Sequence, residues 1–322
     1  MCRHLAYLGP PASLRSLLLD PPHSLYRQAW APRLQQHGTV NADGFGMGWY
    51  ADGDPVPARY RQGVPIWGDP SLPDLARVIR SGAVLAAVRS ATPGTATGAE
   101  AAAPFGSGTW LFSHNGVAHG WRDWASQAFV LPNPRPGGDK PLPGGPGTGG
   151  GPGFLSSVEA LVDSAFLWAL VLERLRAGQA MSAALAGTIT AVEAAGGTGR
   201  FNFLLTDGRS IAATACGDTL WYRRAGGDAE APITGPPTTP SATRKPAMGR
   251  PGTDASGASV TVASEPSDDE PGWTEVPERH LLACTAREVS VRPLASLPAG
   301  NPGGPVTTRT DGEVSIEGIF TA

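Results

Sequence analysis

The chain has 322 residues, a formal net charge of −3 and 16% charged residues. This length allows a large buried core, and the charge gives no electrostatic basis for binding nucleic acid or an anionic membrane. The cysteines (Cys2, Cys216 and Cys284) are too widely spaced for a disulfide framework or a zinc motif. The sequence also predicts no secretory signal or membrane span. We therefore expect a cytoplasmic protein with free thiols.

The first half of the chain is predicted to consist mainly of strands. Apolar runs bounded by turn residues predict strands at 2–8, 45–50, 58–62, 83–88 and 109–113. Helical spacing is present at 13–19 and 72–80. The 109–113 strand is expected to end at Asn115-Gly116, because Asn-Gly is a common turn signal.

The second half is predicted to begin with two helices. Ser156 and Glu159 have capping-box spacing ahead of a periodic apolar run, and a second helix is predicted at 180–194. Further strands are predicted at 201–205, 210–215, 220–223, 260–263, 280–283 and 289–291. Two helices between two sets of antiparallel strands indicate a layered α+β fold.

Two segments are dominated by Pro, Gly, Ser and Thr. Their composition predicts disordered insertions at 132–153 and 226–257, because it provides too few apolar side chains to pack. We therefore predict a single domain over 2–297 that carries both insertions, followed by a C-terminal tail at 298–322.

Cys2 is the first candidate for chemistry. If Met1 is removed, one residue carries both a thiol and an α-amine, and an α-amine with a pKa of about 7.7–8.0 can act as a base near neutral pH. Such a residue is a self-contained nucleophile. The alternative is a small buried residue on the first strand. His4 would share its face of a regular strand, whereas Cys216 and Cys284 are expected to be buried and inert.

Four other residues could bind or activate a substrate. Asn115 and Gly116 could donate N–H groups to an oxyanion, or simply form a turn. Arg89 follows a buried strand and could grip a carboxylate with help from Thr92, or be an exposed strand end. Asp163 stands in an otherwise apolar helix and needs a partner, which could be a substrate ammonium or an internal arginine.

Together these pieces resemble the class II glutamine amidotransferases, which are N-terminal-nucleophile hydrolases. The matching motifs occur in the order of that family: Met1-Cys2, Arg89-Ser-Ala-Thr92, Ser113-His-Asn115-Gly116 and Val162-Asp163-Ser164. The resemblance implies a four-layer αββα sandwich, Cys2 as the nucleophile, Asn115 and Gly116 as the oxyanion hole, and a glutamyl head group held by Arg89 and Asp163. Pro93 and Ala165 depart from the pattern of many amidotransferases, but neither change removes a catalytic group.

Longer motifs are similar to those of the γ-glutamyl hydrolases of ergothioneine biosynthesis. They include Cys2-Arg-His-Leu5, Asn41-Ala-Asp-Gly-Phe-Gly-Met-Gly-Trp-Tyr50, Ala263-Ser-Glu-Pro266 and Trp273-Thr-Glu-Val-Pro-Glu-Arg-His280. This likeness implies cleavage of the γ-glutamyl amide of γ-glutamyl-hercynylcysteine S-oxide through a Cys2 thioester. A small-molecule γ-glutamyl substrate is thus the expected partner, and no cofactor, metal, nucleic acid or membrane is expected. The oligomeric state cannot be derived from the sequence.

Three points stay open at this stage. The chain could instead be the glutaminase subunit of an ammonia-transferring amidotransferase, or a non-catalytic binding protein on the same scaffold. A trimethylammonium on the leaving group could contact aromatic faces, and Phe45, Trp49, Tyr50 and Trp67 are candidates. The alternative for these four residues, which we favour, is a place in the core.

Overall fold

The protein is described here from a computed structural model that covers residues 2–38, 40–92, 94–130, 158–226 and 257–294. Both predicted insertions fall largely outside these residues, as does the predicted tail. The domain limits therefore stay a prediction. Within the covered part of the chain, no helix is long and apolar enough to cross a membrane.

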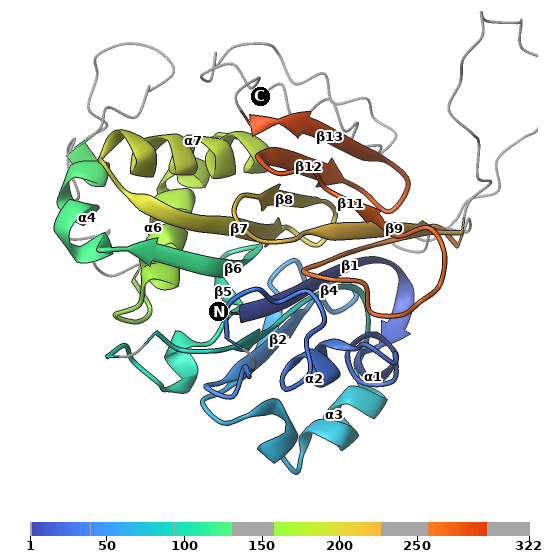
Figure 1. Ribbon diagram of the computed structural model, residues 1–322. Coiled ribbons are helices and arrows are strands. Elements are labelled where there is room, and N and C mark those ends of the chain that lie inside the picture. The colour runs from blue at the N-terminus through green and yellow to red at the C-terminus, as the bar shows by residue number, and fades with distance from the viewer. Residues whose placement is uncertain (1, 39, 93, 131–157, 227–256, 295–322) are drawn as a thin grey trace, which may run out of the picture.

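Two antiparallel sheets form the centre of the molecule (Figure 1). The first sheet has seven strands in the order β11 (Thr274–Glu275), β9 (Trp221–Ala225), β10 (Ser259–Ala263), β1 (Cys2–Ser13), β4 (Arg80–Arg89), β2 (Phe45–Trp49) and β3 (Ala58–Gln62). The second has six strands in the order β13 (Val289–Pro293), β12 (His280–Cys284), β8 (Ile211–Ala215), β7 (Thr198–Thr206), β6 (Trp110–His119) and β5 (Phe105–Ser107).

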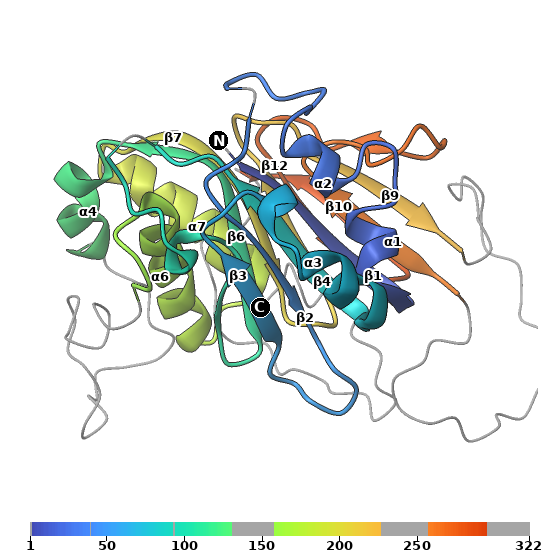
Figure 2. The same ribbon diagram turned by 90° about the horizontal axis from the view of Figure 1, so that it is seen from below.

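Helices cover the outer face of each sheet. Those that follow strands of the first sheet are α1 (Leu14–Leu18), α2 (Leu25–Gln28) and α3 (Leu72–Val78), and short 3-10 turns lie at Ile66–Gly68 and Ala99–Ala101. The second sheet is associated with α4 (Trp121–Val130), α6 (Asp163–Arg176) and α7 (Met181–Ala194). Two views show that α4 and α6 lie toward one end of the sandwich and α1 and α2 toward the other (Figures 1 and 2).

Three apolar clusters fill the spaces between these layers. One packs α6 and α7 against the second sheet, one packs α1 to α3 against the first, and the third lies between the sheets. Alternation along β1 explains the division, since Leu5 and Tyr7 enter the helix-side cluster whereas Ala6 and Leu8 enter the inter-sheet cluster. The structure is a four-layer αββα sandwich, which confirms the predicted fold class.

The Asn115-Gly116 pair does not end a strand, and this prediction was wrong. β6 continues to His119, and Gly116 lies opposite Phe201 of β7 within the ladder. Gly116 has a φ of 154°, and a Cβ there would overlap the backbone carbonyl oxygen of Arg200. Glycine is therefore required here by the close approach of the neighbouring strand and not by a turn.

The predicted capping box at the first long helix was also wrong. α6 begins at Asp163, and its N-cap residue Val162 makes no side-chain hydrogen bond. Glu159 instead accepts hydrogen bonds from Arg59 and from the Gly106 amide, at 3.0 and 3.1 Å. Ser156 lies outside the described residues. An ion pair to β3 thus replaces the local cap that the spacing suggested.

Two further features of the second half were not predicted. The helix α4 follows β6 directly, and its residues Trp121, Trp124, Ala125 and Ala128 have helical spacing and contact the core. β9 does not follow β8 in one sheet but pairs with β10 and β11 of the first sheet. Gly217, with a φ of 97°, stands in the connection where the chain leaves the second sheet. Local turn signals do not tell which sheet a strand joins.

Candidate active site

Cys2 and Arg89 meet across the first sheet. They are directly opposite in the antiparallel pairing of β1 with β4, and opposite residues on such strands share a face. Cys2 is half-buried, and β1 contacts both β6 and β7 of the second sheet. The start of β1, near the N-terminal label in Figure 1, therefore lies next to the second sheet.

Asn115 lies against Cys2 from the opposite sheet. The Cys2 backbone N–H donates to Asn115 Oδ1 at 3.3 Å, although 113 residues separate them. Asn115 is fully buried, and its Nδ2 group donates to Ser264 Oγ over a long 3.5 Å. An amide nitrogen carries two hydrogens, so one donor remains for another acceptor.

Ser264, which directly follows β10, ties three strands together. Its hydroxyl accepts the His4 N–H at 3.1 Å as well as the Asn115 amide, and its own N–H donates to the His4 carbonyl at 3.0 Å. Sequence reasoning gave Ser264 no role. The only signal was its place in the Ala263-Ser-Glu-Pro266 motif that carries the family likeness.

His4 shares the face of Cys2, as predicted, but its contact is with the scaffold. Its Nδ1 atom lies 3.2 Å from Ser113 Oγ, and its ring is fully buried. Burial lowers the pKa of His4 to about 3, helped by nearby His114 and Arg3, so the imidazole is neutral at ordinary pH. We call Cys2, His4, Ser113, Asn115 and Ser264 the thiol cluster.

His114 points to the other side of β6 and joins it to α6. Its Nε2 atom lies 2.8 Å from the Arg200 carbonyl oxygen and must carry the proton, so Nδ1 accepts from Ser164 Oγ at 3.0 Å. Burial lowers its pKa, partly offset by Asp163. His114 therefore orients the start of α6, and its hydrogen bonds within the described residues go to Ser164 and Arg200.

Arg89 is buried, with 7% of its surface exposed, and binds only neutral acceptors in the described structure. Nη1 donates to the Asp43 carbonyl at 3.2 Å, and Nη2 donates to Thr95 Oγ1 at 3.2 Å and to the Ala96 carbonyl at 2.7 Å. These contacts fix the guanidinium without neutralising its charge. A buried cation of this kind favours an anionic ligand nearby.

Asp43 organises the segment that follows Arg89. Its N–H donates to the Arg89 carbonyl at 2.9 Å, and its Oδ2 atom accepts the Ala91 N–H at 2.8 Å. In the sequence, Asp43 stood out only as part of the Asn41–Tyr50 motif that carries the family likeness. The signal for its role is visible only in three dimensions, since Asp43 and Ala91 belong to loops 48 residues apart.

Asp163 is the first residue of α6, where the helix dipole favours a carboxylate. Its Oδ2 atom accepts the Ala118 N–H at 2.9 Å, and Oδ1 accepts the Ser164 N–H at 2.8 Å. The internal arginine that could have paired with it is not found among the described residues. Each carboxylate oxygen therefore keeps capacity for a further donor.

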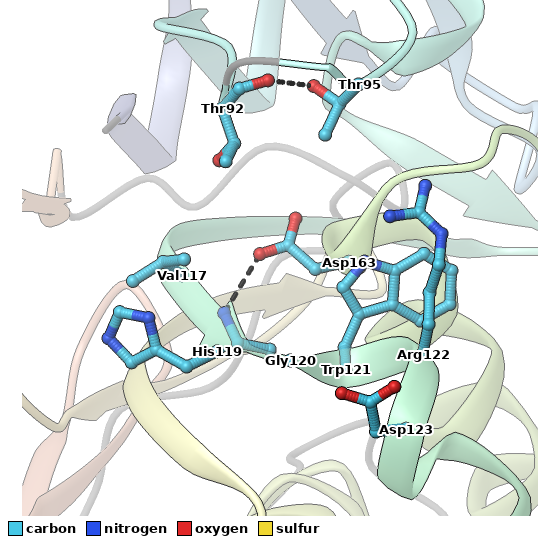
Figure 3. A pocket seen from close by; sticks show the side chains of 10 residues that line it. Thr92, Thr95, Val117, His119, Gly120, Trp121, Arg122, Asp123 and Asp163 are labelled. Atoms are coloured by element: carbon cyan, nitrogen blue, oxygen red, sulfur yellow. Dashed lines mark hydrogen bonds between the residues drawn. The ribbon is translucent and has the colours of Figure 1, made fainter.

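Thr92 and Asp163 line opposite walls of a pocket of about 370 Å³ (Figure 3). We call it the β6–α4 pocket; it is lined by Thr92, Thr95, Val117, Ala118, His119, Gly120, Trp121, Arg122, Asp123 and Asp163. Val117 and Ala118 follow Asn115-Gly116 on β6, so this one strand runs from the thiol cluster to the pocket. Thr95 also binds Arg89, which connects the arginine to the pocket wall.

The remaining residues singled out from the sequence are two cysteines and four aromatic residues. Cys216 and Cys284 are buried as expected, and burial raises the pKa of Cys216 to about 11 and the pKa of Cys284 still further from its ordinary value. Among the aromatic candidates, Phe45 is buried in the helix-side cluster, and the Tyr50 hydroxyl donates to the Thr109 and Thr206 carbonyls. None of the four lines the β6–α4 pocket, and Trp67 is exposed, so the favoured place in the core was wrong for that residue.

Comparison with known proteins bears on the fold and the family of this chain. A solved structure described as a glutamine aminotransferase class-II domain protein from Silicibacter pomeroyi superposes with a TM-score of 0.55, at 23% identity over 91% of this chain and 99% of that one. The fold is therefore that of the class II glutamine amidotransferase domains. A search against family models found no match.

Two curated relatives are more similar in sequence. Both are named gamma-glutamyl-hercynylcysteine sulfoxide hydrolase. The one from Mycolicibacterium smegmatis is 37% identical over 91% of this chain and 100% of its own length. The one from Mycobacterium tuberculosis strain CDC 1551 / Oshkosh is 37% identical over 91% of this chain and 97% of its own length. The chain belongs to the gamma-glutamyl-hercynylcysteine sulfoxide hydrolase family and is thus a hydrolase.

Proposed function

We propose that this protein hydrolyses the γ-glutamyl amide of γ-glutamyl-hercynylcysteine sulfoxide and releases glutamate and hercynylcysteine sulfoxide. The relatives that span the chain carry the name of this activity. The observation that carries the mechanism is the 3.3 Å contact between the Cys2 nitrogen and Asn115 Oδ1. It brings a residue with both a thiol and, after removal of Met1, a free amine next to an oxyanion donor.

Acylation begins at the thiol. The Cys2 α-amine takes the thiol proton, and the thiolate sulfur attacks the γ-carbonyl carbon. Asn115 Oδ1 orients the amine, while its open Nδ2 hydrogen and the Gly116 N–H stabilise the oxyanion. The C–N bond then breaks, the Cys2 ammonium returns its proton to the leaving nitrogen, and a thioester remains.

Deacylation uses the same groups. Water loses a proton to the Cys2 amine and attacks the thioester carbonyl, and the thiol leaves with that proton. The sum of the two steps is the addition of one water across the amide bond. Throughout, Arg89 and Thr92 hold the glutamyl carboxylate and Asp163 holds the ammonium, which fixes the carbonyl in reach of the sulfur.

Substitution of the nucleophile tests this function. Cys2→Ala should lower glutamate release from γ-glutamyl-hercynylcysteine sulfoxide by about 10⁴-fold or more, as loss of a covalent nucleophile does elsewhere. Cys284→Ala removes a buried thiol between the sheets and should leave the rate within about twofold. Turnover retained in Cys2→Ala would refute the mechanism. Stronger hydrolysis of glutamine than of the sulfoxide would favour an ammonia-donating glutaminase instead.

A further inference from the structure

Arg89 accounts for only part of the carboxylate recognition that the proposed function needs. Three of its five guanidinium hydrogens are engaged by the Asp43 carbonyl, Thr95 and the Ala96 carbonyl. Arg89 is also not among the residues that line the β6–α4 pocket. Its fork therefore holds the segment after β4 in place and has two hydrogens left for a ligand.

The pocket wall contains another arginine. Arg122 lies in the first turn of α4, and its guanidinium stacks over the Trp121 ring at 4.9 Å from the centroid. Trp121 in turn packs against Phe166 of α6, with ring centroids 5.3 Å apart. This packing holds Trp121 against the helix that Asp163 begins, and the exposed Arg122 side chain lies over the Trp121 ring on the same side of the pocket.

Opposite charges line this pocket without pairing with each other. Arg122 has no ion-pair partner among the described residues, and Asp163 has none either. Figure 3 shows the Asp163 carboxylate and the Arg122 guanidinium on the side that faces Thr92 and Thr95. Asp123 also lines the pocket, and in Figure 3 its carboxylate lies on the other side of Trp121 from the Asp163 carboxylate.

We propose that Arg122 is a specificity-determining residue that binds the α-carboxylate of the γ-glutamyl substrate, while Asp163 binds its α-ammonium. This inference rests on the proposed function and extends it to a residue outside the motifs of the family likeness. A pocket with separated opposite charges and threonine hydroxyls fits the zwitterionic end of an α-amino acid. It disfavours ligands that lack the ammonium, because the half-buried Asp163 carboxylate would then lose its partner, whereas the exposed Arg122 adds an attraction for the carboxylate that solvent screens.

The test compares two ligands that differ only at the carboxylate. L-Glutamate and 4-aminobutyrate share the ammonium and the distal carboxylate, but 4-aminobutyrate lacks the α-carboxylate. In Arg122→Gln we expect calorimetric affinity for glutamate to fall about tenfold and affinity for 4-aminobutyrate to stay unchanged, with Arg122→Lys in between. The KM for the γ-glutamyl substrate should rise by the same factor at constant kcat.

A matched control separates the loss of the Arg122 contact from the effect of a change in net charge. Arg209→Gln removes an exposed cation from the turn between β7 and β8, outside the pocket, and should leave both affinities unchanged. Equal losses for both ligands in Arg122→Gln, or no loss for glutamate, would overturn the proposal. Binding is measured without turnover, so a failure of the hydrolase assignment would appear separately as wild-type protein that binds glutamate but does not cleave the amide.

Discussion

The thiol cluster and the β6–α4 pocket are neighbours built in different ways. Strands of both sheets supply most of the cluster, and its polar atoms bind one another over long sequence distances, as in the Cys2–Asn115 and His4–Ser264 contacts. Loops and helix starts form much of the pocket, where Arg122 and Asp163 form no ion pair within the described part of the chain. In the proposed function, reaction geometry thus depends on the core of the fold, whereas recognition depends on separable side chains. Substitutions in the cluster should lower stability or kcat, and substitutions around the pocket should change KM.

The largest effect on stability is expected next to the cluster. Glu265 is fully buried, lies 3.8 Å from the buried Arg3 guanidinium, and accepts the backbone N–H groups of Arg33 and Leu34 at 2.9 and 2.8 Å. Glu265→Ala leaves one buried cation and two amides without their acceptor. We expect a loss of about 3–5 kcal/mol in the free energy of unfolding, measured with urea. A loss below about 1 kcal/mol would show that the core does not depend on this residue.

Asn115→Ala should affect catalysis more than binding. Loss of one oxyanion donor typically lowers kcat about 10²–10³-fold, and KM should change little because the carboxamide does not contact the glutamyl head. Steady-state kinetics on the γ-glutamyl substrate measures both parameters. A rise in KM with kcat preserved would assign Asn115 to substrate binding. It would contradict the view that the thiol cluster sets kcat and the pocket sets KM.

Substitution of Asp43 should disturb the wall of the β6–α4 pocket without changing the thiol cluster. Asp43→Ala removes the acceptor of the Ala91 N–H and should loosen the segment that carries Thr92, which we expect to raise KM about tenfold at nearly constant kcat. Asp43→Asn keeps an amide oxygen for that bond and should restore most of the affinity. If Asn fails to rescue KM, the charge of Asp43 matters and not its hydrogen bond.

The smallest effect concerns acid stability. His4 has a folded pKa of about 3, below the ordinary value of 6.5, so the unfolded chain takes up the proton first and stability is lost as pH falls from 6.5 toward 3. Between pH 6 and pH 5 this residue should contribute a loss of at most about 1.4 kcal/mol. His4→Asn should reduce that slope in urea unfolding. An unchanged slope would mean that His4 is not the titrating group.

The sequence predicted the layers well and the connections less well. Alternation in β1 and the apolar run of β4 identified strands that the core requires. Short motifs named Cys2, Asn115, Arg89 and Asp163 as candidates, and their roles stay predictions. Nothing local could assign Ser264 or Asp43, because their roles depend on hydrogen bonds between distant segments. The Asn115-Gly116 pair was misread as a turn, because glycine is required there by the close approach of the neighbouring strand β7.

The central claim is that the first residue of the processed chain is the nucleophile. Intact-protein and peptide mass spectrometry, before and after treatment with a diazo-ketone analogue of glutamine, tests it most directly. We expect a mass without Met1 and a single adduct on Cys2, with Cys216 and Cys284 unmodified because both are buried. Retention of Met1 on fully active protein, or an adduct on any other residue, would contradict the account.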